Sequence, residues 1–167
     1  MKQAQQKQFA HASGNLDFIH IQTASGENMS VADPLGTTHM LAPDASDEVI
    51  GAALLDCLSH SRFLPYEENR GFYDDMEASE RRIDEWVKAT MKQYKYRSRR
   101  ALFFGVDVCT VEKYGGNIVI EPSCHVRSEF WVRRKTDAFE DVIIPDSSLP
   151  NEIGKALRVA FSRCTGE

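Results

Sequence analysis

The chain has 167 residues, of which 42% are hydrophobic and 27% are charged, a composition typical of a soluble globular protein that buries a core. Its formal net charge of −5 argues against a general nucleic-acid binder, because such proteins are usually basic. The sequence predicts no transmembrane helix, since no apolar run approaches about 18 residues.

The chain begins with MKQAQQKQFAHASG, a polar stretch rich in glutamine. This stretch lacks the apolar centre of a secretory signal, so the protein is expected to be cytoplasmic. We expect residues 1–13 to form a flexible polar tail and residues 14–167 to form a single domain.

Strand and helix signals follow one another over the next fifty residues. The stretch LDFIHIQT at 16–23 alternates in hydrophobicity and contains β-branched residues, which predicts a strand. Residues 24–45 are rich in Gly, Pro, Ser and Asp and predict loops with one short strand near 38–41. An amphipathic helix is predicted over 46–62, with Ser46 as its N-cap.

A second amphipathic helix is predicted over 74–95. Acidic residues lie at its start and lysines at its end, which is the order that the helix dipole favours. Its apolar stripe consists of Ile83, Trp86, Val87, Thr90, Met91 and Tyr94.

After this helix the hydrophobic period changes from that of a helix to that of a strand. Strands are predicted over 101–113, 117–122, 129–135 and 140–145. The sequence YGGN between the first two predicts a hairpin turn, because its two glycines supply positive φ angles. Successive strands of this kind predict an antiparallel meander over 101–145.

The last predicted helix, at 150–163, contains a repeat of the first. IGKALRVAFS at 153–162 shares five of ten residues with IGAALLDCLS at 50–59. Two alternatives explain this likeness: a chance similarity of two amphipathic helices, or a structural duplication. The shared glycines, Gly51 and Gly154, would allow another backbone to approach closely.

These elements predict an α+β fold. A mainly antiparallel sheet is expected to pack against three main helices, at about 46–62, 74–95 and 150–163.

Motifs of catalysis and metal binding are missing from the sequence, which contains no P-loop, G-x-S-x-G or H-E-x-x-H pattern. The five histidines are scattered, and neither a metal nor another cofactor is expected. The four cysteines, Cys57, Cys109, Cys124 and Cys164, are widely spaced and are expected to be buried thiols rather than disulfides or nucleophiles. We therefore expect the protein not to be an enzyme.

Two charged blocks are candidates for binding a partner. Residues 66–80 contain six acidic residues and one basic residue, whereas residues 88–100 contain six basic residues and no acidic one. The helix dipole and a solvated helix face account for part of this pattern. The basic block would fit RNA or DNA, and the acidic block would fit a basic protein surface.

The net negative charge favours the acidic block, in which aromatic side chains would supply anchors and carboxylates would steer the encounter. The candidate partner-binding residues are Tyr66, Glu67, Glu68, Phe72, Tyr73, Asp74, Asp75 and Glu77. The region 101–135 is the next candidate interface.

Several stretches resemble a known family. They are IGAALLDCLSHSR at 50–62, WVKATMKQYKYRSRRALF at 86–103 and, most specifically, IIPDSSLPNEIGKALRVAFSRC at 143–164. This order of motifs is similar to the immunity proteins of bacterial contact-dependent growth inhibition systems, the CdiI-type family once described only as a domain of unknown function. The likeness extends from about residue 40 to Cys164.

The resemblance implies a non-enzymatic inhibitor in the bacterial cytoplasm. It would bind the C-terminal toxin domain of the matching CdiA effector, often a nuclease, and block its active site. Some members of the family receive a toxin hairpin by strand addition, which needs an open sheet edge such as the strands at 101–135 would offer.

Two other hypotheses remain at this point. The basic segment 88–100 would make the protein a nucleic-acid-binding module that uses Lys92, Lys95, Arg97, Arg99 and Arg100. A cysteine-dependent enzyme would need a thiol beside a histidine and an acid, and nothing in the spacing places such groups together.

Overall fold

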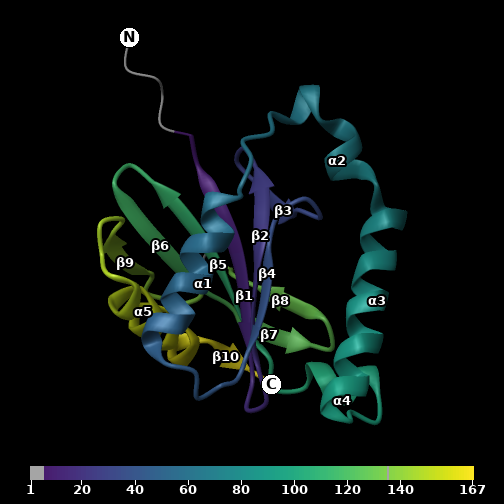
Figure 1. Cartoon of the computed structure of the whole chain (residues 1–167). Helices are drawn as coiled ribbons and strands as arrows, with labels where there is room; N and C mark the ends of the chain where they lie inside the picture. The colour runs from purple at the N-terminus through teal and green to yellow at the C-terminus, as the bar shows by residue number, and fades with distance from the viewer. Residues whose placement is uncertain (1–5, 135) are drawn as a thin grey trace.

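The computed structural model describes residues 6–134 and 136–167, and most of its strands form one sheet (Figure 1). The strand order is β3-β2-β1-β5-β6-β9, β4 also pairs with β2, and every pairing in this sheet is antiparallel. The strands are β1 (Gln8–Gly14), β2 (Ile19–Gly26), β3 (Ser30–Ala32), β4 (Thr38–Leu41), β5 (Asp107–Tyr114), β6 (Asn117–Pro122) and β9 (Val142–Pro145). Together with the helices, this sheet confirms the α+β prediction.

The N-terminal prediction is wrong for residues 8–13. These residues belong to β1, which lies inside the sheet between β2 and β5. The strand signal is weak because the positions of β1 that face the main core hold small residues, Ala10 and Ala12, where a strand usually carries β-branched ones. The remainder of the predicted tail at residues 1–5 lies outside the described residues.

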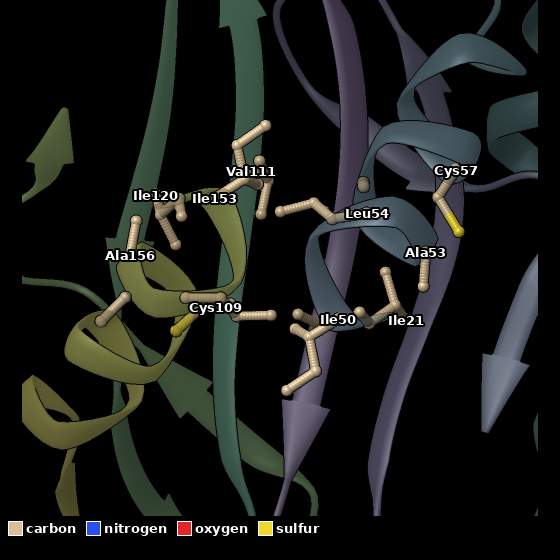
Figure 2. Close-up of a cluster of buried hydrophobic side chains, with 14 of the residues drawn as sticks. Ile21, Ile50, Ala53, Leu54, Cys57, Cys109, Val111, Ile120, Ile153 and Ala156 are labelled. Atoms are coloured by element: carbon tan, nitrogen blue, oxygen red, sulfur yellow. The ribbon is translucent and has the colours of Figure 1, made fainter. Parts of the chain in front are cut away.

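Two helices cover one face of the sheet, α1 (Asp47–Ser59) and α5 (Pro150–Arg163). The prediction of a helix at 150–163 is confirmed, and so is the cap of α1, where the Ser46 hydroxyl accepts a hydrogen bond from the Val49 amide. Figure 2 shows Ile50, Leu54 and Ile153 pointing into the layer between these helices and the sheet. This layer is the main hydrophobic core.

The shared glycines bring α1 and α5 together. Each is the fifth residue of its helix and lies against the first residue of the other helix. A Cβ atom on Gly51 would be 1.7 Å from the carbonyl oxygen of Pro150, and one on Gly154 would be 1.9 Å from that of Asp47. The expected close approach is confirmed, and the repeated residues serve the same contact from both sides.

The remaining helices lie in the chain between α1 and β5, away from the face of the sheet that α1 and α5 cover. They are the short 3-10 helix η1 (Tyr66–Glu68), α2 (Arg70–Asp74), α3 (Met76–Tyr94) and α4 (Arg99–Phe103). The predicted helix at 74–95 corresponds to α3. The predicted strand at 101–113 is wrong for residues 101–106. Residues 101–103 belong to α4, where Ser98 caps the helical turn by accepting a hydrogen bond from the Ala101 amide, and residues 104–106 form a turn before β5.

The predicted meander is interrupted after β6. Strands β7 (Cys124–Arg127) and β8 (Phe130–Val132) leave the main sheet and form a second sheet with β10 (Thr165–Gly166). Pro122, which has no amide hydrogen to donate, is the last residue of β6, and β9 then takes the place beside β6. Within the described residues, no helix is long and apolar enough to span a membrane.

Candidate partner-binding site

The two faces of the main sheet differ in chemistry. Ala12 of β1, Ile21 of β2 and Cys109 of β5 point into the main core. In each of these strands the residues directly before and after them point to the opposite face of the sheet. That second face carries mostly small polar and histidine side chains: His11, Ser13, His20, Gln22, Val108 and Thr110. A sheet face of this kind offers hydrogen-bonding groups to whatever covers it.

A cleft of about 690 Å³ lies over this polar face. Its other walls come from the segment 30–38, from α3, and from the residues around α4 and β8. Figure 1 shows α3 standing apart from the main sheet, with the small β7–β8 sheet close to its lower end. The cleft therefore collects side chains from parts of the chain as far apart as His11 and Trp131.

The cleft contains two histidines that are neutral at pH 7. Burial lowers the pKa of both His11 and His20 to about 4, and the nearness of the His11 ring lowers that of His20 further. Each ring is within hydrogen-bonding distance of a hydroxyl group, His11 Nε2 at 2.9 Å from Ser30 Oγ and His20 Nε2 at 2.9 Å from Thr38 Oγ1. The floor of the cleft is thus polar but uncharged.

Aromatic rings close one end of the cleft. The Trp86 ring of α3 stacks on His20 with 4.9 Å between the ring centroids, and Trp131 of β8 meets Phe103 at 5.8 Å. These rings adjoin a second core cluster that includes Phe18 and Val87. This cluster anchors the C-terminal half of α3 to the sheet.

An ion-pair group fastens the same end on the outside. The Arg99 guanidinium donates hydrogen bonds of 2.5 Å to Asp84 of α3 and of 2.6 and 2.7 Å to the Glu129 carboxylate, which lines the cleft. Arg99 therefore joins α3, α4 and the turn before β8. This residue belongs to the predicted basic block, but its charge is already paired.

A buried carboxylate holds the opposite end of the cleft. The Asp33 side chain is fully buried and accepts two hydrogen bonds from Arg62, of 2.7 and 2.9 Å, and one from Ser25 of 2.6 Å. Burial alone would raise the pKa of Asp33, but these bonds hold it below its ordinary value. The Arg62 guanidinium also lies 5.7 Å from the centroid of the Phe72 ring and so ties the following segment to the sheet.

The eight predicted binding residues lie on the segment 66–77, called the acidic arm below. It joins α1 to α3 at the upper end of α3 in Figure 1 and does not line the cleft itself. The three aromatic residues, Tyr66, Phe72 and Tyr73, are close together, with ring centroids 5.3 Å and 5.2 Å apart in the two neighbouring pairs. The Tyr73 hydroxyl donates a hydrogen bond to the Leu64 carbonyl oxygen, which holds this ring against the chain that leads into the arm.

Two carboxylates of the acidic arm have clear partners within the arm and α3, and the other three are less engaged. Asp75 caps α3 by accepting a hydrogen bond from the Ala78 amide, and Glu67 pairs with Arg70. The others, Glu68, Asp74 and Glu77, are also exposed, and Asp74 accepts a long hydrogen bond of 3.2 Å from Tyr66. The arm therefore presents exposed negative charge beside partly exposed aromatic surface.

The sequence does not predict the cleft. Its lining contains many Ser, Thr and His residues, which form no recognisable motif. The one sequence signal for it is the alternation of polar residues in FAHAS and IHIQT, which indicates that one face of these strands is polar. Among residues 6–134 and 136–167, no three His, Cys, Asp or Glu side chains gather in a way that could hold a metal ion. Nucleic-acid binding by the segment 88–100 stays a prediction.

Comparison with known proteins gives a consistent result over nearly the whole chain. Residues 8–164 match the family model of the CDI immunity protein. The chain is 38% identical to the immunity protein CdiI-YPIII of Yersinia pseudotuberculosis, over 95% of this chain and 96% of that one.

Two solved structures have the same fold, each with a TM-score of 0.86. One is a CdiA-CT/CdiI toxin and immunity complex from Yersinia pseudotuberculosis, with 36% identity over 95% of this chain and 98% of that chain. The other is a protein of unknown function from Neisseria meningitidis, with 32% identity over 98% of this chain and 99% of that chain.

Proposed function

The chain belongs to the CDI immunity protein family, and from this premise we propose that it binds and neutralises the C-terminal toxin domain of a matching CdiA protein. The observation that carries the proposal is the likeness, over nearly the whole chain, to the immunity partner in a solved toxin–immunity complex. Family membership also confirms the resemblance seen in the sequence. We further propose that the toxin is a nuclease and that the encounter takes place in the bacterial cytoplasm.

In this proposal the protein acts by binding and not by catalysis. An inhibitor of this kind needs a surface that fits the toxin and covers its active site. A nuclease carries basic residues that contact phosphates, so an acidic surface is its natural complement. The acidic arm supplies that charge, and the partly exposed aromatic residues beside it supply the kind of side chain that dominates binding energy at interfaces.

The cleft is the second surface at which we propose that the toxin binds. Among the described residues β8 pairs only with β7, so its other edge has free backbone groups, and Trp131 of β8 and the preceding Glu129 line the cleft. An extended segment of the toxin would add a strand to this edge and lie in the cleft, with its side chains against the polar face of the main sheet. The arm would then steer the encounter and the cleft would hold the inserted segment.

Co-expression tests neutralisation directly. The toxin domain encoded beside this protein is produced with and without it, and we expect growth only when both are present. Equal loss of viability in the two cultures would overturn the proposal. Incubating the purified toxin with DNA and with RNA, with and without the protein, tests the proposed nuclease activity and its inhibition.

Charge reversal tests the acidic arm. The double variant Asp74→Lys/Glu77→Lys leaves the helix cap Asp75 intact, and we expect it to lower the association rate with the toxin about tenfold at low salt. The control variant Asp44→Lys/Glu140→Lys makes the same change of charge at exposed positions outside the arm and should alter the rate by less than about twofold. Equal effects of the two variants would place the interface elsewhere.

Filling the cleft tests the second contact. Thr110→Trp puts a large ring on the polar face of β5, and we expect it to weaken binding at least about a hundredfold, mostly through faster dissociation. The control, Lys88→Trp, adds the same ring at an exposed site of α3 and should leave the affinity unchanged. Circular dichroism verifies that both variants fold, and an unchanged affinity of folded Thr110→Trp would remove the cleft from the interface.

A further inference from the structure

Two cysteines meet at the edge of the main core. Cys109 lies in β5, Cys164 caps the C-terminus of α5, and their sulfur atoms are 3.7 Å apart although the residues are 55 positions apart in the chain. A disulfide bond requires a sulfur–sulfur distance of about 2.05 Å. The remaining gap is short enough to be closed by small rotations of the two side chains and a slight shift of the end of the helix.

The two thiols differ in their surroundings. Cys109 is fully buried, whereas Cys164 is partly exposed at the end of α5. The hydrogen bond between the sulfur atoms lowers the pKa of Cys164 and raises that of Cys109, and burial raises the pKa of Cys109 further. Cys164 is therefore the thiol that an oxidant reaches and the one that forms a thiolate more readily.

We propose that Cys109 and Cys164 form a modification site, at which a hydroperoxide converts the two thiols into a disulfide bond. The Cys164 thiolate attacks one peroxide oxygen of hydrogen peroxide, the O–O bond breaks, and a sulfenic acid forms as hydroxide leaves and takes up a proton to become water. The Cys109 sulfur then attacks the Cys164 sulfur, the S–O bond breaks, and a second water leaves. Two thiols and one hydrogen peroxide thus give one disulfide and two waters.

The position of the pair determines what the bond would change. Cys109 points to the face covered by α1 and α5, and its neighbours Val108 and Thr110 point to the cleft. The bond would tie the end of α5 to a central strand without adding an atom to the polar face. It would act as a staple that stabilises the fold and leaves partner binding unchanged.

Mass spectrometry of the intact, folded protein tests the inference. After brief treatment with hydrogen peroxide, we expect the loss of two hydrogen atoms and, after proteolysis without reductant, a peptide that joins Cys109 to Cys164. The melting temperature should rise by about 5 °C and return to its starting value with dithiothreitol.

Single substitutions identify the thiols. Cys164→Ser should abolish the cross-link, whereas Cys124→Ser, which removes another partly exposed thiol, should leave it unchanged. A bond between Cys164 and Cys124, or oxidation of Cys164 to a sulfinic acid with no cross-link in the unmodified sequence, would overturn the proposal. Because the main result comes from the natural chain, it does not depend on whether a variant folds.

Discussion

At the scale of single residues, the two glycines of the repeat allow a direct backbone contact between two helices. Gly51 and Gly154 let the first turns of α1 and α5 touch through their backbones, and Arg158 secures the contact by donating to Asp47 and to the carbonyl oxygens of Pro43 and Ala45. No rotation of a side chain can relieve a clash with a carbonyl oxygen. A single added methyl group therefore has to move one helix.

We expect Gly51→Ala and Gly154→Ala each to lower the free energy of unfolding by about 3 kcal/mol or more, as measured by urea denaturation. The control is Gly71→Ala in α2, where a Cβ atom would meet nothing within 4 Å. Its effect should be neutral or slightly stabilising, because alanine favours a helix. A loss for Gly71→Ala as large as for the other two would contradict the packing argument.

The histidines of the cleft predict how stability responds to acid. The pKa of His20 is about 4 in the folded protein and about 6.5 when unfolded, so the unfolded state binds more protons between these values and stability falls as the pH falls from 6.5 to 4. We expect His20→Gln to reduce the loss between pH 7 and pH 4.5 by about 2 kcal/mol. Urea titrations of the variant and of the unmodified protein at the two pH values would check this difference, and an equal loss in both would contradict it.

At the scale of elements, the two ends of α3 are attached to the sheet in different ways. The aromatic contacts of Trp86 and the ion pairs of Arg99 hold its C-terminal half, whereas Ser79 and Ile83 farther up the helix line the open cleft. The upper end is connected to the sheet through the acidic arm and the Arg62–Asp33 pair. The width of the cleft is therefore set by these two attachments.

We expect Trp86→Ala to loosen α3 more than the rest of the fold. Hydrogen exchange of the amides in 76–94 should become at least about tenfold faster, while the amides of α1 and α5 keep their protection. The exposed neighbour Glu85 supplies the control, since Glu85→Ala removes no packing and should leave exchange unchanged. Uniformly faster exchange throughout the chain would show that α3 and the sheet unfold as one unit.

The elements differ in how well their sequence predicts them. Helices α1 and α5 follow from strong local signals, a serine or proline at the start and apolar residues three and four apart. Strand β1 does not, because the pattern of its small buried residues gains meaning only when β2 and β5 pair with it. The same holds for the cleft, whose lining is brought together by topology, whereas the acidic arm is visible because its charges are adjacent in the chain.

At the scale of the whole molecule, charge and packing occupy different places. The apolar core and the helix pair α1–α5 lie on one side of the sheet, and the acidic arm, the cleft and α3 belong to the other. Long-range attraction can therefore guide a basic partner to the second side without involving the residues of the main core.

This arrangement predicts a salt effect on binding. We expect the association rate with the toxin to fall about tenfold between roughly 50 and 500 mM NaCl, with little change in the dissociation rate, because salt screens the steering charges. The variant Asp74→Lys/Glu77→Lys should show a flatter dependence in the same stopped-flow experiment. An association rate that is independent of salt for the unmodified protein would remove electrostatic steering from the account.

The alternation of side chains along β1, β2 and β5 has a consequence for how such a protein changes over generations. In every second position a substitution disturbs the main core, while in the positions between, such as Ser13 and Thr110, it alters the lining of the cleft. If the cleft holds the toxin as proposed, a lineage can replace the lining residues one at a time while the main core stays unchanged. The same strands would then carry slowly changing core residues on one face and rapidly changing binding residues on the other.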